Sequence, residues 1–151
     1  MTSEAEGYLE RLDYLRDEFK KEIRDMSPEE LAWKPLDQDT NSPYVLATHV
    51  AGTEAFHIHQ LVGGIDVHRN RDAEFAASGM DTSHLEHLLN ETGETTRQVL
   101  SNTTTADLDE TFEYRGQPVT RRWAVLHTLE HIGQHLGHLT LTKQLYRAQN
   151  G

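Results

Sequence analysis

The sequence TRRWAVLHTLEHIGQHLGHLTLTKQLYRA, residues 120–148, predicts one long helix, because its apolar side chains recur at helical spacing. One sector of the helix that this spacing predicts carries the apolar residues Val125, Leu129, Ile132, Leu136 and Leu139. The neighbouring sector carries four histidines, His127, His131, His135 and His138. At about 100° per residue, these four lie within roughly 80° of one another. The histidines therefore border the buried face of a long helix.

Upstream of that helix, the sequence predicts three more of the same kind. Residues 3–26 alternate apolar and charged side chains at helical spacing. A second helix is expected over residues 42–64, because a serine–proline pair begins it and paired glycines end it. A third helix is expected over residues 81–102 or 83–102. With the last helix, these elements predict an all-α four-helix bundle.

The segments between the helices are long. Residues 27–30, Ser-Pro-Glu-Glu, predict a short capped turn of helix. Residues 65–80 show little pattern and are predicted to form a loop. Residues 111–120 are expected to form either a short hairpin or an extended loop. The bundle should therefore have longer inter-helix loops than a minimal one, within a single domain over residues 1–151.

Composition limits the classes of function. The chain has 151 residues, 36% hydrophobic and 26% charged, which is typical of one globular domain. Its formal net charge of −11 disfavours nucleic-acid binding, because phosphates would repel such a surface. Neither a membrane span nor a signal peptide is recognisable, and cysteine is absent. We therefore expect a cytoplasmic protein that acts on a small molecule without disulfides or thiolate ligands of its own.

The histidine spacing predicts a metal site. Imidazoles four residues apart on a helix can reach one metal ion, so His131 can pair with either His127 or His135. A mononuclear site then needs a third ligand from another element. On the second helix, His49 lies in the middle of an otherwise mainly apolar stripe, where an unpartnered imidazole would be costly. Three nitrogen ligands suit one divalent ion, zinc or nickel.

Two other interpretations stay open at this point. His49 also fits a hydrogen-bonded core residue, and the four histidines of the last helix also fit a solvated stripe in a metal-free helical module. His57 lies at the edge of the stripe that contains His49. We expect the remaining histidines to be surface residues without a special role, namely His59, His68, His84 and His87.

Two motifs resemble the DinB/YfiT-like superfamily of metalloenzymes. The first is Trp33-x-Pro35, followed after a gap by a helix that carries His49 and then Glu54. The second is residues 121–138, RRWAVLHTLEHIGQHLGH, which is similar to the last helix of that superfamily. The resemblance extends from about Trp33 to the C-terminus. It implies a DinB/YfiT-like four-helix bundle with one bound metal.

Carried over residue by residue, the resemblance implies that His49, His131 and His135 are the metal ligands. Mycothiol-dependent members often have Glu where this chain has His131. It also implies a thiol-dependent transferase, isomerase or hydrolase that uses a low-molecular-weight thiol as cosubstrate. Because the chain lacks cysteine, any sulfur nucleophile would have to arrive with that cosubstrate.

Three further side chains are candidates for supporting the metal ligands. Glu54 could orient an imidazole, and His127 and His138 could shuttle protons or support a ligand. No residue is assigned to catalysis. The alternative function is a non-catalytic, stress-associated metal-binding protein. A homodimer is expected, because residues 3–26 present a continuous apolar face.

Overall fold

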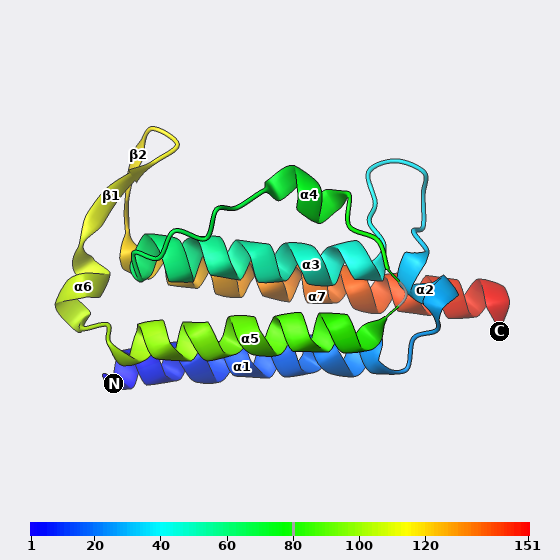
Figure 1. Cartoon of the computed structure of the whole chain (residues 1–151), viewed down its shortest axis with the longest axis horizontal. Helices are drawn as coiled ribbons and strands as arrows, with labels where there is room; N and C mark the ends of the chain where they lie inside the picture. Colours follow the sequence, from blue (N-terminus) through cyan, green and yellow to red (C-terminus); the bar gives the residue numbers. More distant parts are fainter. Residues whose placement is uncertain (80) are drawn as a thin grey trace.

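Four long helices packed side by side form the body of the protein (Figure 1). The computed structural model describes residues 1–79 and 81–151. The long helices are α1 (Ser3–Arg24), α3 (Pro43–Glu54) with its π-helical continuation η1 (Ala55–Val62), α5 (Thr82–Ser101) and α7 (Arg121–Asn150). The predicted all-α four-helix bundle is confirmed.

Smaller elements join the long helices. They are the short helices α2 (Pro28–Ala32), α4 (Arg71–Phe75) and α6 (Thr105–Asp109), and the strands β1 (Thr111–Tyr114) and β2 (Gln117–Thr120). The two strands pair antiparallel, so the segment before α7 is a hairpin rather than an extended loop. Arg115 and Gly116 form its turn with φ of +52° and +79°, the left-handed backbone that a tight hairpin turn requires.

Side-chain caps explain where the helices begin. A hydroxyl or carboxylate accepts a hydrogen bond from a backbone N–H of the first turn at Thr2, Ser27, Ser42, Asp81, Thr104 and Thr120. Each such cap is worth about 1 kcal/mol of helix stability. Proline follows the cap in α2 and α3, where its missing N–H costs nothing. The serine–proline starts seen in the sequence are therefore the true starts of two helices.

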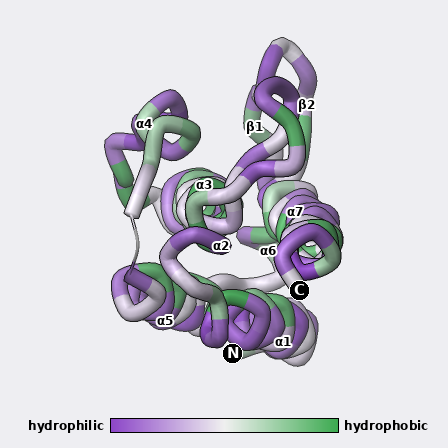
Figure 2. The backbone as a smooth tube through the Cα atoms, turned by 90° about the vertical axis from the view of Figure 1, so that its right-hand side faces the viewer, coloured by the Kyte–Doolittle hydropathy of each residue, from purple (hydrophilic) through white to green (hydrophobic). Residues whose placement is uncertain are grey.

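Viewed end-on, the four long helices lie at the corners of the bundle, and α4 lies outside it against α3 (Figure 2). Helix α1 packs on α5 and α7, and α3 also packs on α5 and α7. The largest fully buried apolar side chains include Phe19, Leu12, Ile23, Ile58, Leu89, Leu100, Ile132 and Leu139. They come from every long helix, so the core runs along the bundle axis. Within the described residues, no helix is long and apolar enough to cross a membrane.

The prediction of a continuous loop over residues 65–80 is wrong. Residues 71–75 form α4, which Asn70 caps through its side chain. A five-residue helix is too short to show helical periodicity in the sequence. The last residue of the predicted loop, Met80, lies outside the described residues.

The prediction of a surface position for His59 is also wrong, because its side chain is only 5% exposed. His57 is buried as well. Both lie in η1, where the backbone bonds span five residues instead of four. The wider turns rotate the later side chains away from the positions that an α-helical projection gives. The other three histidines expected on the surface, His68, His84 and His87, are exposed.

Candidate metal centre

Helices α3 and α7 bring His49, His131 and His135 together. One nitrogen from each imidazole lies within 4.8 Å of the other two. The Nε2 atoms of His49 and His131 are 3.0 Å apart. The ring of His135 lies 4.4 Å from that of His131 and 5.1 Å from that of His49, centroid to centroid. The i, i+4 pair on α7 and the central histidine of α3 therefore meet in space, as the sequence predicts.

Glu74 fixes the orientation of His49. The Nδ1–H of His49 donates to Glu74 Oε1 at 2.9 Å. Arg69 donates to the same carboxylate from Nε and Nη2, at 2.8 and 3.0 Å. Burial acts to raise the pKa of Glu74, but the hydrogen bonds from His49 and Arg69 outweigh it and leave that pKa lowered. Because the ionised carboxylate holds the Nδ1 proton, the lone pair of His49 Nε2 points toward His131.

Close packing between α3 and α4 brings Glu74 into contact with His49. Gly52 lies under the Glu74 carboxylate, and a Cβ at that position would overlap its oxygens. Sequence reasoning missed Glu74 and Arg69. No spacing in the sequence could have revealed them, because they reach His49 only through the packing of a short helix against α3.

The two triad histidines of α7, His131 and His135, are held in the neutral form. Burial, with the neighbouring imidazoles, lowers the pKa of His131 to about 3 and that of His135 to about 4. Among the described residues, His131 Nδ1 is buried without a hydrogen-bond partner. Neutral imidazoles that converge in a half-buried place are the donor set that zinc and nickel accept. Three such ligands leave at least one coordination position open, so the residues fit a catalytic ion better than a closed structural one.

Two of the three supporting candidates lie beside the triad. His138 Nδ1 is 3.2 Å from His135 Nδ1, and the side chain of His138 is exposed. His127 stacks on Trp123 at 4.9 Å and lies 6.2 Å from His131, ring to ring. His138 therefore contacts a predicted ligand directly, whereas His127 belongs to an aromatic cluster next to it.

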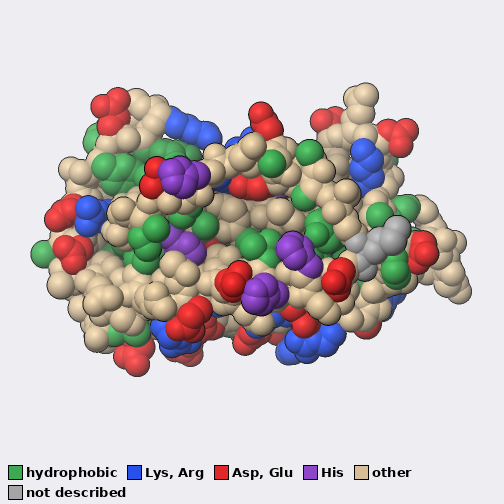
Figure 3. Space-filling model, viewed as in Figure 1, with side chains coloured by type: hydrophobic (Ala, Val, Ile, Leu, Met, Phe, Trp, Pro, Cys, Tyr) green, Lys and Arg blue, Asp and Glu red, His purple; other side chains and the backbone are tan. Residues whose placement is uncertain are grey.

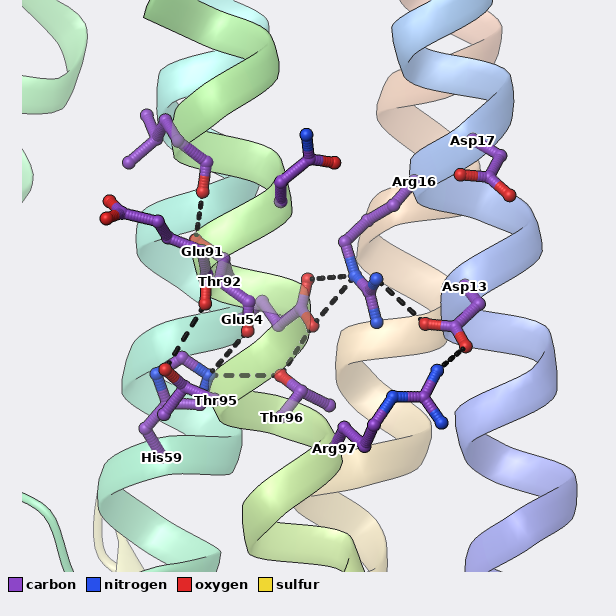
Figure 4. A network of polar contacts seen from close by, with 12 residues as sticks. Asp13, Arg16, Asp17, Glu54, His59, Glu91, Thr92, Thr95, Thr96 and Arg97 are labelled. Atoms are coloured by element: carbon purple, nitrogen blue, oxygen red, sulfur yellow. Dashed lines mark hydrogen bonds and ion pairs between the residues drawn. The ribbon is translucent and has the colours of Figure 1, made fainter.

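Glu54 lies elsewhere, in a buried polar network between α1, α3 and α5 (Figure 4). Its carboxylate accepts from Arg16 Nε at 3.1 and 3.2 Å and from the Thr96 hydroxyl at 2.6 Å. His59 Nε2 lies 3.0 Å from the same hydroxyl. Burial raises the pKa of Glu54, and Arg16 opposes that rise. Among the described residues, Glu54 therefore makes no hydrogen bond to the triad. Glu74 instead orients His49, which is the role that the sequence suggests for Glu54.

A family model described as mycothiol-S-transferase matches residues 8–148, nearly the whole chain. A search of curated proteins found no match.

Several solved structures share the fold. A conserved protein from Enterococcus faecalis has a TM-score of 0.76 at 18% identity, over 93% of this chain and 95% of its own. A DinB-like protein from Bacillus subtilis has a TM-score of 0.72 at 20% identity, over 93% and 91%. YfiT from Bacillus subtilis has a TM-score of 0.78 at 15% identity, over 97% and 89%, and is described as "a probable metal-dependent hydrolase with an unusual four-helix bundle topology". At these identities the likeness concerns the fold.

The motifs around His49 and on α7, the bundle that they build and the family match over residues 8–148 agree. The chain belongs to the mycothiol-S-transferase family, within the DinB/YfiT-like superfamily.

Proposed function

We propose that this protein is a metal-dependent transferase that joins a low-molecular-weight thiol to an electrophilic small molecule. His49, His131 and His135 would hold one divalent ion, zinc or nickel. The observation that carries the proposal is the convergence of three imidazole nitrogens within 4.8 Å of one another, two of them on histidines that burial keeps neutral. Membership of the mycothiol-S-transferase family supports a thiol as the cosubstrate.

A divalent ion, when bound, supplies a Lewis acid that favours the deprotonated form of a thiol or water. The chain's own residues supply position. Glu74 and Arg69 hold His49 in one ring orientation, and His138 contacts His135. Since the sequence has no cysteine, the sulfur must come from the cosubstrate.

The overall reaction balances without an oxidant. The thiol loses its proton, its sulfur forms a bond to the electrophilic carbon, and the leaving group departs with the electron pair of the broken bond. The released proton and the leaving group together complete the second product. The same site with water in place of the thiol would give hydrolysis, the activity named for YfiT from Bacillus subtilis.

Metal content tests the ligand assignment. We expect about one zinc or nickel ion per chain by elemental analysis of untagged protein, and loss of that ion in His49→Ala and His135→Ala. The matched control is His84→Ala, which removes an exposed histidine of α5 far from the triad in sequence. Protein that stays metal-free after reconstitution with zinc and nickel would refute the site.

Thiol consumption tests the reaction. Metal-loaded protein should consume mycothiol in the presence of a neutral alkyl halide, and His135→Ala should reduce the rate to that of the uncatalysed reaction. His84→Ala should keep the wild-type rate. Turnover of an ester at the same rate with and without thiol would instead identify a hydrolase and contradict the transferase.

A further inference from the structure

A pocket of about 360 Å³ opens beside His135, one of the three histidines of the triad. We propose that it binds an uncharged small molecule through an alkyl or aryl group and so selects the electrophilic substrate, an inference that rests on the proposed function. Its lining residues come from the loop before α3, from α3 itself and from α7: Pro35, Asp39, Thr40, Asn41, Leu46, His135, His138, Leu141, Thr142 and Leu145. A volume of this size is at the lower end of the range for small-ligand sites.

Leucines provide the apolar part of the lining. Leu141 and Leu145 lie one helical turn apart on α7 and are 53% and 39% exposed. Leu46 of α3 and Pro35 extend the apolar surface. Large apolar side chains left open to water in a concave place favour an apolar occupant, because its binding removes both surfaces from water.

The pocket is continuous with the metal centre. His135 belongs both to the predicted ligands and to the pocket lining, and His138 lies between it and the leucines along α7. Positions 135, 138, 141 and 145 follow one another at helical spacing, so they share one face of α7. An apolar group packed on Leu141 and Leu145 therefore leaves the other end of the same molecule near His135, where the transfer would take place.

Charge selects against anions. Among the described residues that line the pocket, Asp39 is the one charged residue apart from the histidines, and none is a lysine or arginine. The whole chain carries a formal charge of −11, and Figure 3 shows acidic side chains spread along the face that it displays. A carboxylate, sulfate or phosphate on the part of the substrate that packs on the leucines would meet Asp39 with no lysine or arginine beside it, whereas an anion at the His135 end would meet the bound divalent ion. Asn41 offers an amide for a neutral polar group instead.

A pair of probes with the same chain and different charge tests the selection. We would titrate the metal-free protein with 1-hexanol and with hexyl sulfate, so that no divalent ion attracts the sulfate, and follow the leucine methyl resonances by NMR. The methyl groups of Leu141 and Leu145 should shift with 1-hexanol, and hexyl sulfate should bind at least tenfold more weakly. Equal or tighter binding of hexyl sulfate would overturn the proposal.

Three substitutions test where the ligand binds and how charge affects its binding. Leu141→Asp should weaken 1-hexanol binding at least tenfold. Leu126→Asp is the matched control, because Leu126 is also on α7 and is 46% exposed but lies outside the pocket lining. Asp39→Lys should reverse the preference and favour hexyl sulfate. If Leu141→Asp keeps full affinity for 1-hexanol but converts a dimer to a monomer in sedimentation equilibrium, a second copy covers this face and the proposal is wrong.

The outcomes separate this inference from the proposed function. Selective binding of 1-hexanol without any thiol consumption would leave the pocket assignment standing and refute the transferase. Thiol transfer to neutral and sulfonated alkyl halides with equal kcat/KM would keep the transferase and refute the selection by charge.

Discussion

The Nδ1–H of His49 donates to Glu74 Oε1 at 2.9 Å, and this bond ties a predicted metal ligand to a helix that lies outside the bundle. Carboxylates in such positions fix the tautomer and the ring orientation of a ligating histidine. The bond makes α4 part of the candidate metal centre. We therefore expect that substitutions at Glu74 and Gly52, which belong to neither histidine motif, change metal binding.

Replacing Glu74 should weaken the metal site without removing a ligand. Glu74→Gln keeps the size of the side chain but removes the charge that holds the His49 proton and pairs with Arg69. We expect zinc affinity, measured by competition with a chelator, to fall about 10- to 100-fold. Asp72→Asn is the control, since Asp72 is an exposed acid of the same short helix and should change nothing. Unchanged zinc affinity in Glu74→Gln would show that α4 does not support the metal site.

Gly52 should be needed for the same contact. Gly52→Ala places a Cβ where the Glu74 carboxylate now lies, so the carboxylate must move from its present place beside His49. Zinc affinity should fall, and His49 should lose its hydrogen-bonded Nδ1 proton signal in NMR spectra. Gly133→Ala offers a matched comparison in α7, because a Cβ there meets nothing within 4 Å. That control should bind zinc normally and gain about 0.5–1 kcal/mol of unfolding free energy, as expected for Gly replaced by Ala in a helix.

The network around Glu54 should matter for stability and not for the metal. Arg16→Met leaves a carboxylate that is 1% exposed without its cation, which typically costs about 3–5 kcal/mol. Urea denaturation measures this loss. Arg97→Met, which removes a half-exposed ion pair with Asp13, should cost less than about 1 kcal/mol. Any Arg16→Met protein that folds should contain its full complement of metal; a metal-free folded variant would show that Glu54 supports the site after all.

His57 should make stability depend on pH. Its side chain is 2% exposed, and burial lowers its pKa to about 4 from the ordinary 6.5. Between those values the unfolded chain binds the proton and the folded protein does not, so stability is lost as the pH falls from about 6.5 toward 4. From pH 7 to pH 5, the wild type should lose about 1–2 kcal/mol more unfolding free energy than His57→Gln. Parallel curves for the two proteins in metal-free buffer would contradict this.

The long helices and the convergence of His49, His131 and His135 are predictable because their signals are local. Residues 120–148 carry both the apolar stripe and the histidines, and the serine–proline starts of α2 and α3 are read directly from the chain. His49 stands out because a basic side chain is centred on an apolar face. In each case the position of the side chain can be predicted from the periodicity of a single helix.

The parts that sequence reasoning misses depend on tertiary packing or on an irregular backbone. Glu74 reaches His49 through a five-residue helix without periodicity. Glu54 has the spacing of a supporting ligand, but Arg16 on α1 provides a closer partner. An α-helical projection places His59 on the surface, whereas the chain is π-helical at that point. None of these outcomes can be read from the spacing of residues on one element.

X-ray absorption at the zinc edge tests whether three histidines hold a zinc ion that binds a thiol, with spectra of zinc-loaded protein taken before and after addition of mycothiol. We expect a shell of imidazole nitrogens at about 2.0–2.1 Å in both spectra. A sulfur at about 2.3 Å should appear only with the thiol, because the chain has no cysteine to supply one. A zinc ion with four protein ligands and no added sulfur would contradict an open site that binds the thiol. Protein that binds no zinc would contradict the zinc site itself.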